Sequence, residues 1–301
     1  MLATAIASQA DDFTLKEQLG HTWIKERVTF PLTPAQRANA VQRQALAGPN
    51  DKVIPYQLVT SGDVNNTQIS FQADLSPMES RTYRFADQPA AAQTDLKVSD
   101  STSELRVENQ WIGLAIRKTL QRGQGPIAGV RLRSGMWTGG SALIKTPAVK
   151  SYTVQLMAGG PVFIEILCLV NFADGGRWSL RFQVERNEPL VLVEESFDVP
   201  GGGNFEVRLG NETCQPTHLF YRSGVGEDMG RANSAAIGAG KLFVLEPWLH
   251  WWESERQGNW FALCSPDSYP ERLMIGLLRP SAWKDPQWSP KARQGELKVP
   301  A

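Results

Sequence analysis

The chain has 301 residues and a formal net charge of zero, with 31 basic and 31 acidic side chains. Balanced charge offers no electrostatic basis for binding nucleic acid or an anionic membrane surface, and we expect neither as a partner. No run approaches the roughly 18 apolar residues of a membrane-spanning helix. The 26 glycines and 19 prolines are spread along the chain, which favours many short strands joined by turns over long helices.

The three cysteines, Cys168, Cys214 and Cys264, are far apart and form no paired metal-ligand spacing. The sequence therefore predicts no zinc site, and we expect no other cofactor. Cys168 lies in the apolar run PVFIEILCLV, which predicts a small buried side chain. The odd number of cysteines leaves the compartment open, and the small residues Ala7–Ala10 are compatible with the remnant of an export signal to the periplasm or the cell exterior.

Short stretches rich in β-branched and aromatic residues recur along the chain, separated by glycine, proline, asparagine and aspartate. This spacing predicts an all-β protein built of sandwiches or stacked sheets. The one helix candidate is Thr33–Ala47, in which Thr33 is placed to cap the helix and Pro34 to occupy its first turn. Its apolar face is mostly alanine, so we expect a short surface helix or an ordered loop.

Two later segments carry further signals. Ala86–Ser103 is poor in large apolar residues and rich in Ala, Ser, Asp and Thr, which predicts a linker or a domain boundary. The stretch from Asp174 to Val199 predicts two strands joined by a turn at Asn187–Pro189, each alternating between a core face and a solvent face. In the first of these strands the predicted core row is Trp178, Leu180, Phe182 and Val184.

Two stretches that flank the predicted linker resemble a known family. They are LSPMESRTYRF (Leu75–Phe85) and ELRVENQWIGLAIRK (Glu104–Lys118), the latter followed by GPIAGVRL. They are similar to the non-catalytic region of the zinc-dependent α-mannosidases and related carbohydrate-active enzymes. In that pattern a small sandwich ends in a proline-centred segment and a tyrosine-bearing strand, and an L-x-x-E-N strand then opens a galactose-mutarotase-like supersandwich. Leu105, Glu108 and Asn109 occupy those places.

The resemblance implies a small N-terminal β-sandwich over residues 1–90 and a large antiparallel supersandwich over residues 91–301. It does not imply zinc chemistry or mannosidase activity, because the family's upstream catalytic domain, with its metal-binding aspartates and histidines, has no counterpart in this sequence. The same architecture occurs in polysaccharide lyases and several glycoside hydrolases, usually beside a helical toroid. We therefore expect an adjoining catalytic domain outside this chain.

Four tryptophans fall within thirteen residues: Trp248, Trp251, Trp252 and Trp260. If Gln257-Gly258 forms a two-residue turn, one face of the resulting hairpin carries Trp251, Glu253, Glu255 and Trp260. Indole rings stack on the C–H faces of sugars, and carboxylates accept hydrogen bonds from hydroxyl groups. This face therefore predicts a sugar platform in which Trp251 and Trp260 bind carbohydrate. The alternatives are packing in a sandwich core or against another domain.

Two groups of residues are candidates for catalysis. Glu253 and Glu255, two places apart on one strand, can meet the carboxylate separations of about 5 Å for retaining or about 6.5–9.5 Å for inverting glycoside hydrolysis. A solvated acidic pair is the alternative. The second group is His218, Tyr221 and Arg222, because lyase chemistry requires a base such as histidine or tyrosine beside an arginine that neutralises a uronate carboxylate. We assign Arg222 to carbohydrate binding, and a structural histidine is the alternative for His218.

These observations predict the carbohydrate-binding β-sandwich portion of a glycoside hydrolase or polysaccharide lyase, which positions an oligo- or polysaccharide for a catalytic domain that the chain lacks. Whether the chain is itself an enzyme stays open. One alternative is a self-contained lyase, glycosidase or aldose epimerase that uses His218, Tyr221, Glu253 or Glu255. The other is a structural scaffold that packs its tryptophan face on a neighbouring domain.

Overall fold

The protein is all-β, and its one helix among the described residues is short, as a computed structural model of the chain shows. The structure describes residues 12–43, 45–49, 52–60, 66–87, 94–200 and 203–209. Beyond these it describes the strands at 218–222, 232–236, 240–241, 260–264, 274–278, 287–291 and 294–300. The predicted all-β fold class is therefore confirmed.

The chain divides into two compact units. The first comprises Met1–Leu96 together with Leu156–Glu165 and Gln183–Glu188, and the remainder forms the second. The boundary after Leu96 falls within the predicted linker segment, Ala86–Ser103. The sequence did not indicate that the two later segments belong to the first unit.

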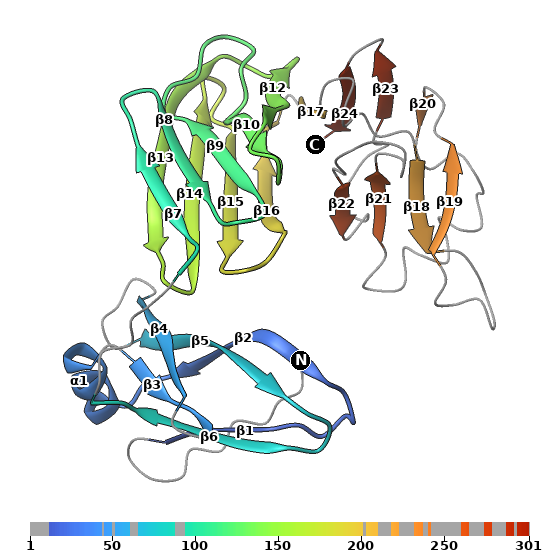
Figure 1. The fold of residues 1–301 in the computed structure, drawn as a ribbon. Coiled ribbons are helices and arrows are strands. Elements are labelled where there is room, and N and C mark those ends of the chain that lie inside the picture. Colours follow the sequence, from blue (N-terminus) through green and yellow to red (C-terminus); the bar gives the residue numbers. More distant parts are fainter. Residues whose placement is uncertain are drawn as a thin grey trace. The chain divides into compact units, whose positions relative to one another are not determined.

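The first unit is a six-stranded antiparallel sheet with the order β1-β6-β3-β4-β5-β2. The chain changes partner inside β4, because Val53–Pro55 pairs with β3 whereas Tyr56–Thr60 pairs with β5. The sheet therefore folds over on itself (Figure 1). Its elements are β1 (Asp12–Lys16), β2 (Trp23–Pro31), α1 (Pro34–Gln42), β3 (Ala45–Ala47), β4 (Val53–Thr60), β5 (Thr67–Leu75) and β6 (Ser80–Phe85).

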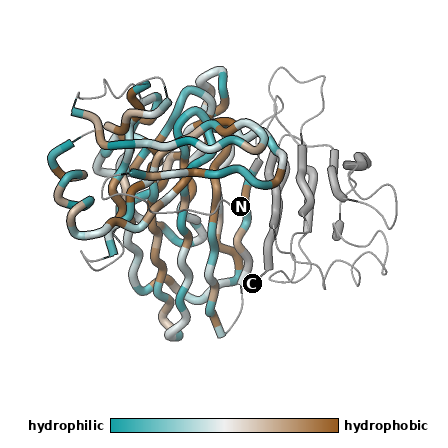
Figure 2. Tube along the Cα trace, turned by 90° about the horizontal axis from the view of Figure 1, so that it is seen from below, coloured by the Kyte–Doolittle hydropathy of each residue, from teal (hydrophilic) through white to brown (hydrophobic). Residues whose placement is uncertain are grey.

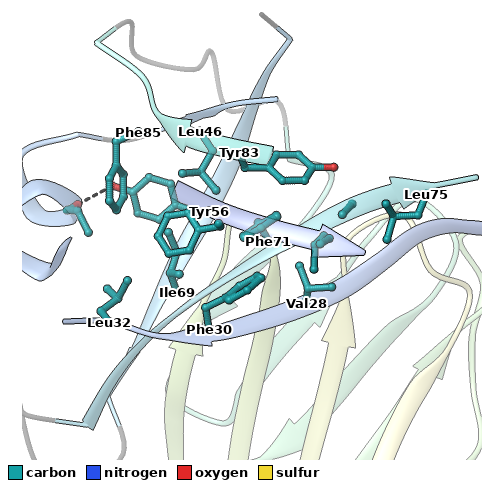
Figure 3. Packing of buried hydrophobic residues seen from close by; sticks show 14 residues of the cluster. Val28, Phe30, Leu32, Leu46, Tyr56, Ile69, Phe71, Leu75, Tyr83 and Phe85 are labelled. Atoms are coloured by element: carbon teal, nitrogen blue, oxygen red, sulfur yellow. Dashed lines mark hydrogen bonds between the residues drawn. The ribbon is translucent and has the colours of Figure 1, made fainter. Parts of the chain in front are cut away.

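The folded sheet encloses an aromatic core (Figure 3). Phe71 is fully buried at the centre, where its ring stacks on Phe30 with centroids 5.8 Å apart and lies edge-on to Phe13 at 6.2 Å. Aromatic pairs of this kind add to the stabilisation that burial of their area provides. The buried residues around them are Leu15, Val28, Leu32, Ala40, Leu46, Tyr56, Ile69, Ala73, Leu75, Tyr83 and Phe85.

The predicted helix is present but shorter than expected. Thr33 caps it through a capping box, in which the Gln36 backbone N–H donates to Thr33 Oγ1 and the Thr33 N–H donates to Gln36 Oε1. The helix ends at Gln42, and the predicted extension to Ala47 is wrong because Ala45–Ala47 forms β3, between β4 and β6. The Tyr56 hydroxyl lies 2.5 Å from the Ala40 carbonyl oxygen and also contacts that of Arg43, so its single proton is shared between the two. This contact attaches the C-terminal end of the helix to the core.

The second unit contains two sheets that form the layers of a sandwich (Figure 1). One has the order β11-β10-β9-β8-β7 and the other β13-β14-β15-β16. The Tyr152 hydroxyl on β13 donates to the Arg117 carbonyl on β9 at 2.9 Å. The strands are β7 (Lys97–Asp100), β8 (Glu104–Glu108), β9 (Gly113–Arg117), β10 (Ile127–Arg131), β11 (Trp137–Thr138), β13 (Val149–Gly159), β14 (Phe163–Phe172), β15 (Arg177–Glu185) and β16 (Val191–Asp198).

Two further sheets belong to the described part of the second unit. Their orders are β12-β17-β24-β23-β20 and β19-β18-β21-β22. The first consists of β12 (Gly140–Ile144), β17 (Asn204–Leu209), β20 (Gly240–Lys241), β23 (Gln287–Lys291) and β24 (Gln294–Pro300). The second consists of β18 (His218–Arg222), β19 (Ala232–Ala236), β21 (Trp260–Cys264) and β22 (Met274–Leu278).

The predicted core row of β15 is confirmed. Trp178, Leu180, Phe182 and Val184 are each at most 1% exposed, and the alternating residues of the strand are more accessible. Cys168 on the neighbouring β14 is also buried, as predicted. Along many strands hydrophobic and hydrophilic residues alternate (Figure 2).

One other expectation about strands is wrong, and one segment contains a strand that the sequence did not indicate. The strand after the Asn187 turn, β16, has no fully buried residue, and six of its eight residues are exposed. It is an edge strand of its sheet. The predicted linker contains a strand, β7, which pairs with β8 from Lys97↔Glu108 to Asp100↔Leu105. All four residues of β7 are exposed. Strand prediction from sequence relies on the alternation of hydrophobic and polar residues. A fully exposed edge strand such as β7 shows no such alternation.

A buried carboxylate joins two loops at one end of the first unit. Glu17 is 3% exposed and accepts hydrogen bonds from the backbone N–H groups of Leu19 (2.8 Å), Gly20 (2.9 Å) and Met78 (2.8 Å), and from the Trp23 indole (3.3 Å). Burial alone would raise the pKa of Glu17. The hydrogen bonds from Met78, Leu19 and Trp23 to the ionised form outweigh it and lower the pKa from 4.5 to about 2.

We expect Glu17→Gln to lower the melting temperature of the protein at pH 7, because the amide cannot accept all four hydrogen bonds. The pKa of Glu17 is lower in the folded state, so its contribution is complete above about pH 4.5 and is lost as the pH falls through about 2. The difference between the variant and the wild type should therefore shrink across this range, as measured by thermal melts followed by circular dichroism.

Glu194→Gln is the matched control, since the Glu194 carboxylate is exposed and lies 3.8 Å from Arg181. Its melting temperature should equal that of the wild type at every pH measured. A Glu17→Gln difference that stayed constant down to pH 2 would show that the carboxylate charge plays no part.

Candidate functional site

Three of the sequence-predicted site residues lie in one strand, and a fourth lies in the strand beside it. His218, Tyr221 and Arg222 belong to β18, and Trp260 begins β21. The two strands pair antiparallel with His218 opposite Cys264 and Tyr221 opposite Phe261. Continuing the same register by one residue places Arg222 opposite Trp260. The topology therefore brings these four residues together in a single sheet.

Alternation along the strands sorts these positions onto two faces. Residues directly opposite each other in an antiparallel pair share a face, and successive residues change face. Positions 218 and 222 therefore share a face with position 260, whereas position 221 lies on the opposite face.

The predicted tryptophan hairpin is wrong. It would pair residues 251–255 with residues 260–264, but β21 has β18 along one edge and β22 along the other. A strand has only two edges, so no third partner can pair with this segment. Trp251, Glu253 and Glu255 lie outside the described residues, and their roles stay predictions.

The residues of the family resemblance have definite structural roles. Leu105 is 3% exposed in the sandwich core. Glu108 forms an ion pair with Arg131, at 2.6 Å between Oε2 and Nε. The buried Asn109 side chain accepts hydrogen bonds through Oδ1 from the backbone N–H groups of Trp111 (2.8 Å) and Ile112 (2.9 Å). Asparagine thereby closes the turn between β8 and β9.

Arg131 connects this turn with the neighbouring one. Its guanidinium donates to the Asn109 carbonyl and to that of Ile112 at 3.5 Å, and also to the Leu132 carbonyl at 3.3 Å. The side chain is only 13% exposed. Arg131 therefore acts as a structural brace between the β8–β9 turn and the end of β10.

Sequence reasoning missed two tryptophans beside this brace. Trp111 lies in the β8–β9 turn and carries the Arg133 guanidinium over its ring, 4.5 Å from the centroid. Trp137 on β11 carries the Arg106 guanidinium at 5.1 Å. Both indoles are half-buried, and both arginines are exposed. The signal that could have found them is a tryptophan in or next to a polar turn, here N-Q-W and R-S-G-M-W.

Cys168 is not a candidate nucleophile. Burial raises the pKa of its thiol to about 12, although the Tyr152 hydroxyl, 3.6 Å from the sulfur, lowers it somewhat. A thiol with this pKa stays protonated at neutral pH and is unreactive. Among the described residues, no group of three or more His, Cys, Asp or Glu is placed to hold a metal ion.

No protein-family model and no curated protein matches the chain. The family resemblance therefore rests on the residues of the two quoted stretches. Within the described part of the chain, no helix has the length and hydrophobicity needed to cross a membrane.

We expect Asn109→Ala to destabilise the protein by about 1–3 kcal/mol, because it leaves two backbone N–H groups of the turn, at part-buried positions, without their acceptor. Urea unfolding followed by tryptophan fluorescence measures the change. Thr119→Ala, at an exposed position between β9 and β10, is the control and should stay within about 0.5 kcal/mol of the wild type. Equal stability of the two variants would contradict the structural role of Asn109.

Proposed function

We propose that the chain is the carbohydrate-binding β-sandwich portion of a glycoside hydrolase or polysaccharide lyase, with a galactose-mutarotase-like second unit. It positions an oligo- or polysaccharide for a catalytic domain outside this chain. The observation that supports this proposal most is the β18–β21 register, which, continued by one residue, puts positions 218, 222 and 260 on one sheet face.

These residue types suit the recognition of a sugar. An indole provides a flat apolar surface for the C–H face of a pyranose ring, and a guanidinium provides paired donors for a hydroxyl or a carboxylate. Imidazole adds a further donor or acceptor. An antiparallel sheet fixes the backbone positions that carry such groups, and order present before binding reduces the entropic cost of binding.

The self-contained enzyme is the second candidate. Lyase chemistry by His218, Tyr221 and Arg222 requires the three to act on one sugar residue, but alternation puts position 221 on the face away from positions 218 and 222. This separation favours a binding role over catalysis by that group. A hydrolase that uses Glu253 and Glu255 does not depend on the face of position 221. A turnover assay distinguishes such an enzyme from a protein that only binds the glycan.

We expect Trp260→Ala and Trp251→Ala to leave the melting temperature nearly unchanged and to weaken retention on polysaccharide affinity gels. Truncating a stacked aromatic at a binding hot spot costs more than ~1 kcal/mol, or more than about fivefold in affinity. Affinity electrophoresis against a panel of neutral and acidic polysaccharides measures the retention.

Trp178→Ala is the contrasting control, since Trp178 is fully buried and its truncation should cost roughly 3–5 kcal/mol of stability. If Trp260→Ala and Trp251→Ala destabilise the protein as much as Trp178→Ala does, their indoles are part of a core and the binding assignment is wrong.

We further expect the chain by itself to release no products from polysaccharides, because the catalytic residues belong to another domain. Reducing-end and unsaturated-product assays on the same panel measure turnover. Activity that disappears in Glu253→Gln and Glu255→Gln, or in His218→Ala, would instead establish the self-contained enzyme.

A further inference from the structure

We propose that two tryptophan–arginine pairs form a binding surface for the carboxylate groups of an acidic polysaccharide. The pair Trp137–Arg106 lies on the outward face of the β7–β11 sheet, and the pair Trp111–Arg133 lies just beyond the ends of β8 and β10. This inference rests on the proposed glycan-binding function and adds the charge of the ligand. It is carried by a surface different from the β18–β21 sheet and by different residues.

The two faces of the β7–β11 sheet differ sharply. The inward row contains Leu105, Val107, Leu114 and Ile116, each at most 3% exposed. The outward row contains Arg106 and Glu108 on β8 and Arg131 on β10. On the strand between them, β9, Ala115 lies opposite Arg106, and Gly113 lies opposite both Glu108 and Arg131. Charged and aromatic side chains therefore gather on the face that the core does not use.

Glycines in the middle of this face leave the space that the Trp137 indole and the Arg131 side chain occupy. A Cβ atom added at Gly129 would lie 3.6 Å from Cε3 of Trp137. One added at Gly113 would lie 3.0 Å from Cβ of Arg131 and 3.2 Å from its Nε. Larger side chains at these positions would lift Trp137 and Arg131 away from the sheet.

The arginines on this surface are of two kinds. Arg131 is bound by Glu108 and by three backbone carbonyls and is nearly buried, so it holds the surface together. Arg106 and Arg133 are exposed, and their guanidinium groups rest on indole rings. Stacking leaves the N–H donors at the edge of a guanidinium available, and these donors match the two oxygens of a carboxylate.

Of the two exposed arginines, Arg133 is the better hydrogen-bond donor to an anion. Arg106 shares its charge with Glu104, at 2.8 Å between Nη2 and Oε2. Arg133 has no carboxylate partner in the part of the chain that the structure describes, and its stacking on Trp111 orders the side chain in advance. An unneutralised cation beside an aromatic surface favours a ligand that is both anionic and apolar-faced, as a uronate sugar is, over a neutral glycan.

The test is affinity electrophoresis of the full chain in gels with polygalacturonate, fully methyl-esterified polygalacturonate or dextran sulfate. We expect retention by polygalacturonate, with Arg133→Gln weakening it at least about tenfold, as loss of a charge-assisted bidentate contact does. Arg133→Lys keeps the charge but loses the planar donor pair, and it should weaken retention to an intermediate extent. The esterified polymer should retain the wild type no better than it retains Arg133→Gln.

Arg122→Gln is the matched control, because Arg122 is exposed in the turn between β9 and β10 and its removal changes the net charge equally. It should stay within about twofold of the wild type. The proposal is overturned if Arg122→Gln loses as much retention as Arg133→Gln, if dextran sulfate alone retains the protein, or if polygalacturonate does not. A different result would overturn this inference and leave the proposed function standing: Trp260→Ala loses retention on neutral glycans, while Arg133→Gln is retained like the wild type on every polymer.

Discussion

The structure depends on the burial of one face of β14 and β15. Nine side chains on these two neighbouring strands are at most 1% exposed: Ile164, Ile166, Cys168, Val170, Phe172, Trp178, Leu180, Phe182 and Val184. Burying each large apolar side chain contributes about 1.5–3 kcal/mol, so a one-residue slip of either strand would cost a sum comparable to the whole net stability of a domain, about 5–15 kcal/mol. The register of this sheet is therefore fixed. The β7–β11 sheet forms the other layer of the sandwich, and its outward face takes no part in this core.

On that outward face, polar groups are secured by the backbone rather than by the core. Arg131 reaches the carbonyls of two turns while Glu108 neutralises its charge, and Asn109 closes one of those turns. Trp111 is part of the turn that Asn109 closes, and Arg133 follows the strand that ends at Arg131. The positions of Trp111 and Arg133 thus follow from the brace, and a ligand would meet groups whose geometry is already set.

The sequence predicted best where a residue interacts with near neighbours or with a continuous core. The Trp178 row follows from period-two alternation, and the Thr33 cap follows from contacts within one turn of helix. Edge strands were missed or misread, since β7 and β16 bury no face and so carry no alternation. The Trp260 pairing was wrong because a local hairpin was assumed, whereas β21 pairs with β18, about forty residues earlier, and with β22. Partner choice between strands so far apart depends on tertiary packing, which no local pattern records.

The same distinction decides what a short family motif can transfer. In L-x-x-E-N, leucine fills the core, glutamate anchors the arginine brace and asparagine closes the turn. All three act on the fold, so a resemblance built on them carries architecture from one protein to another and leaves the reaction undetermined. The residues that we propose to contact a ligand, Trp111 and Arg133, lie outside the motif, in or near the turns that it stabilises. A scaffold of this kind lets the binding residues change while the turn, the brace and the core stay the same.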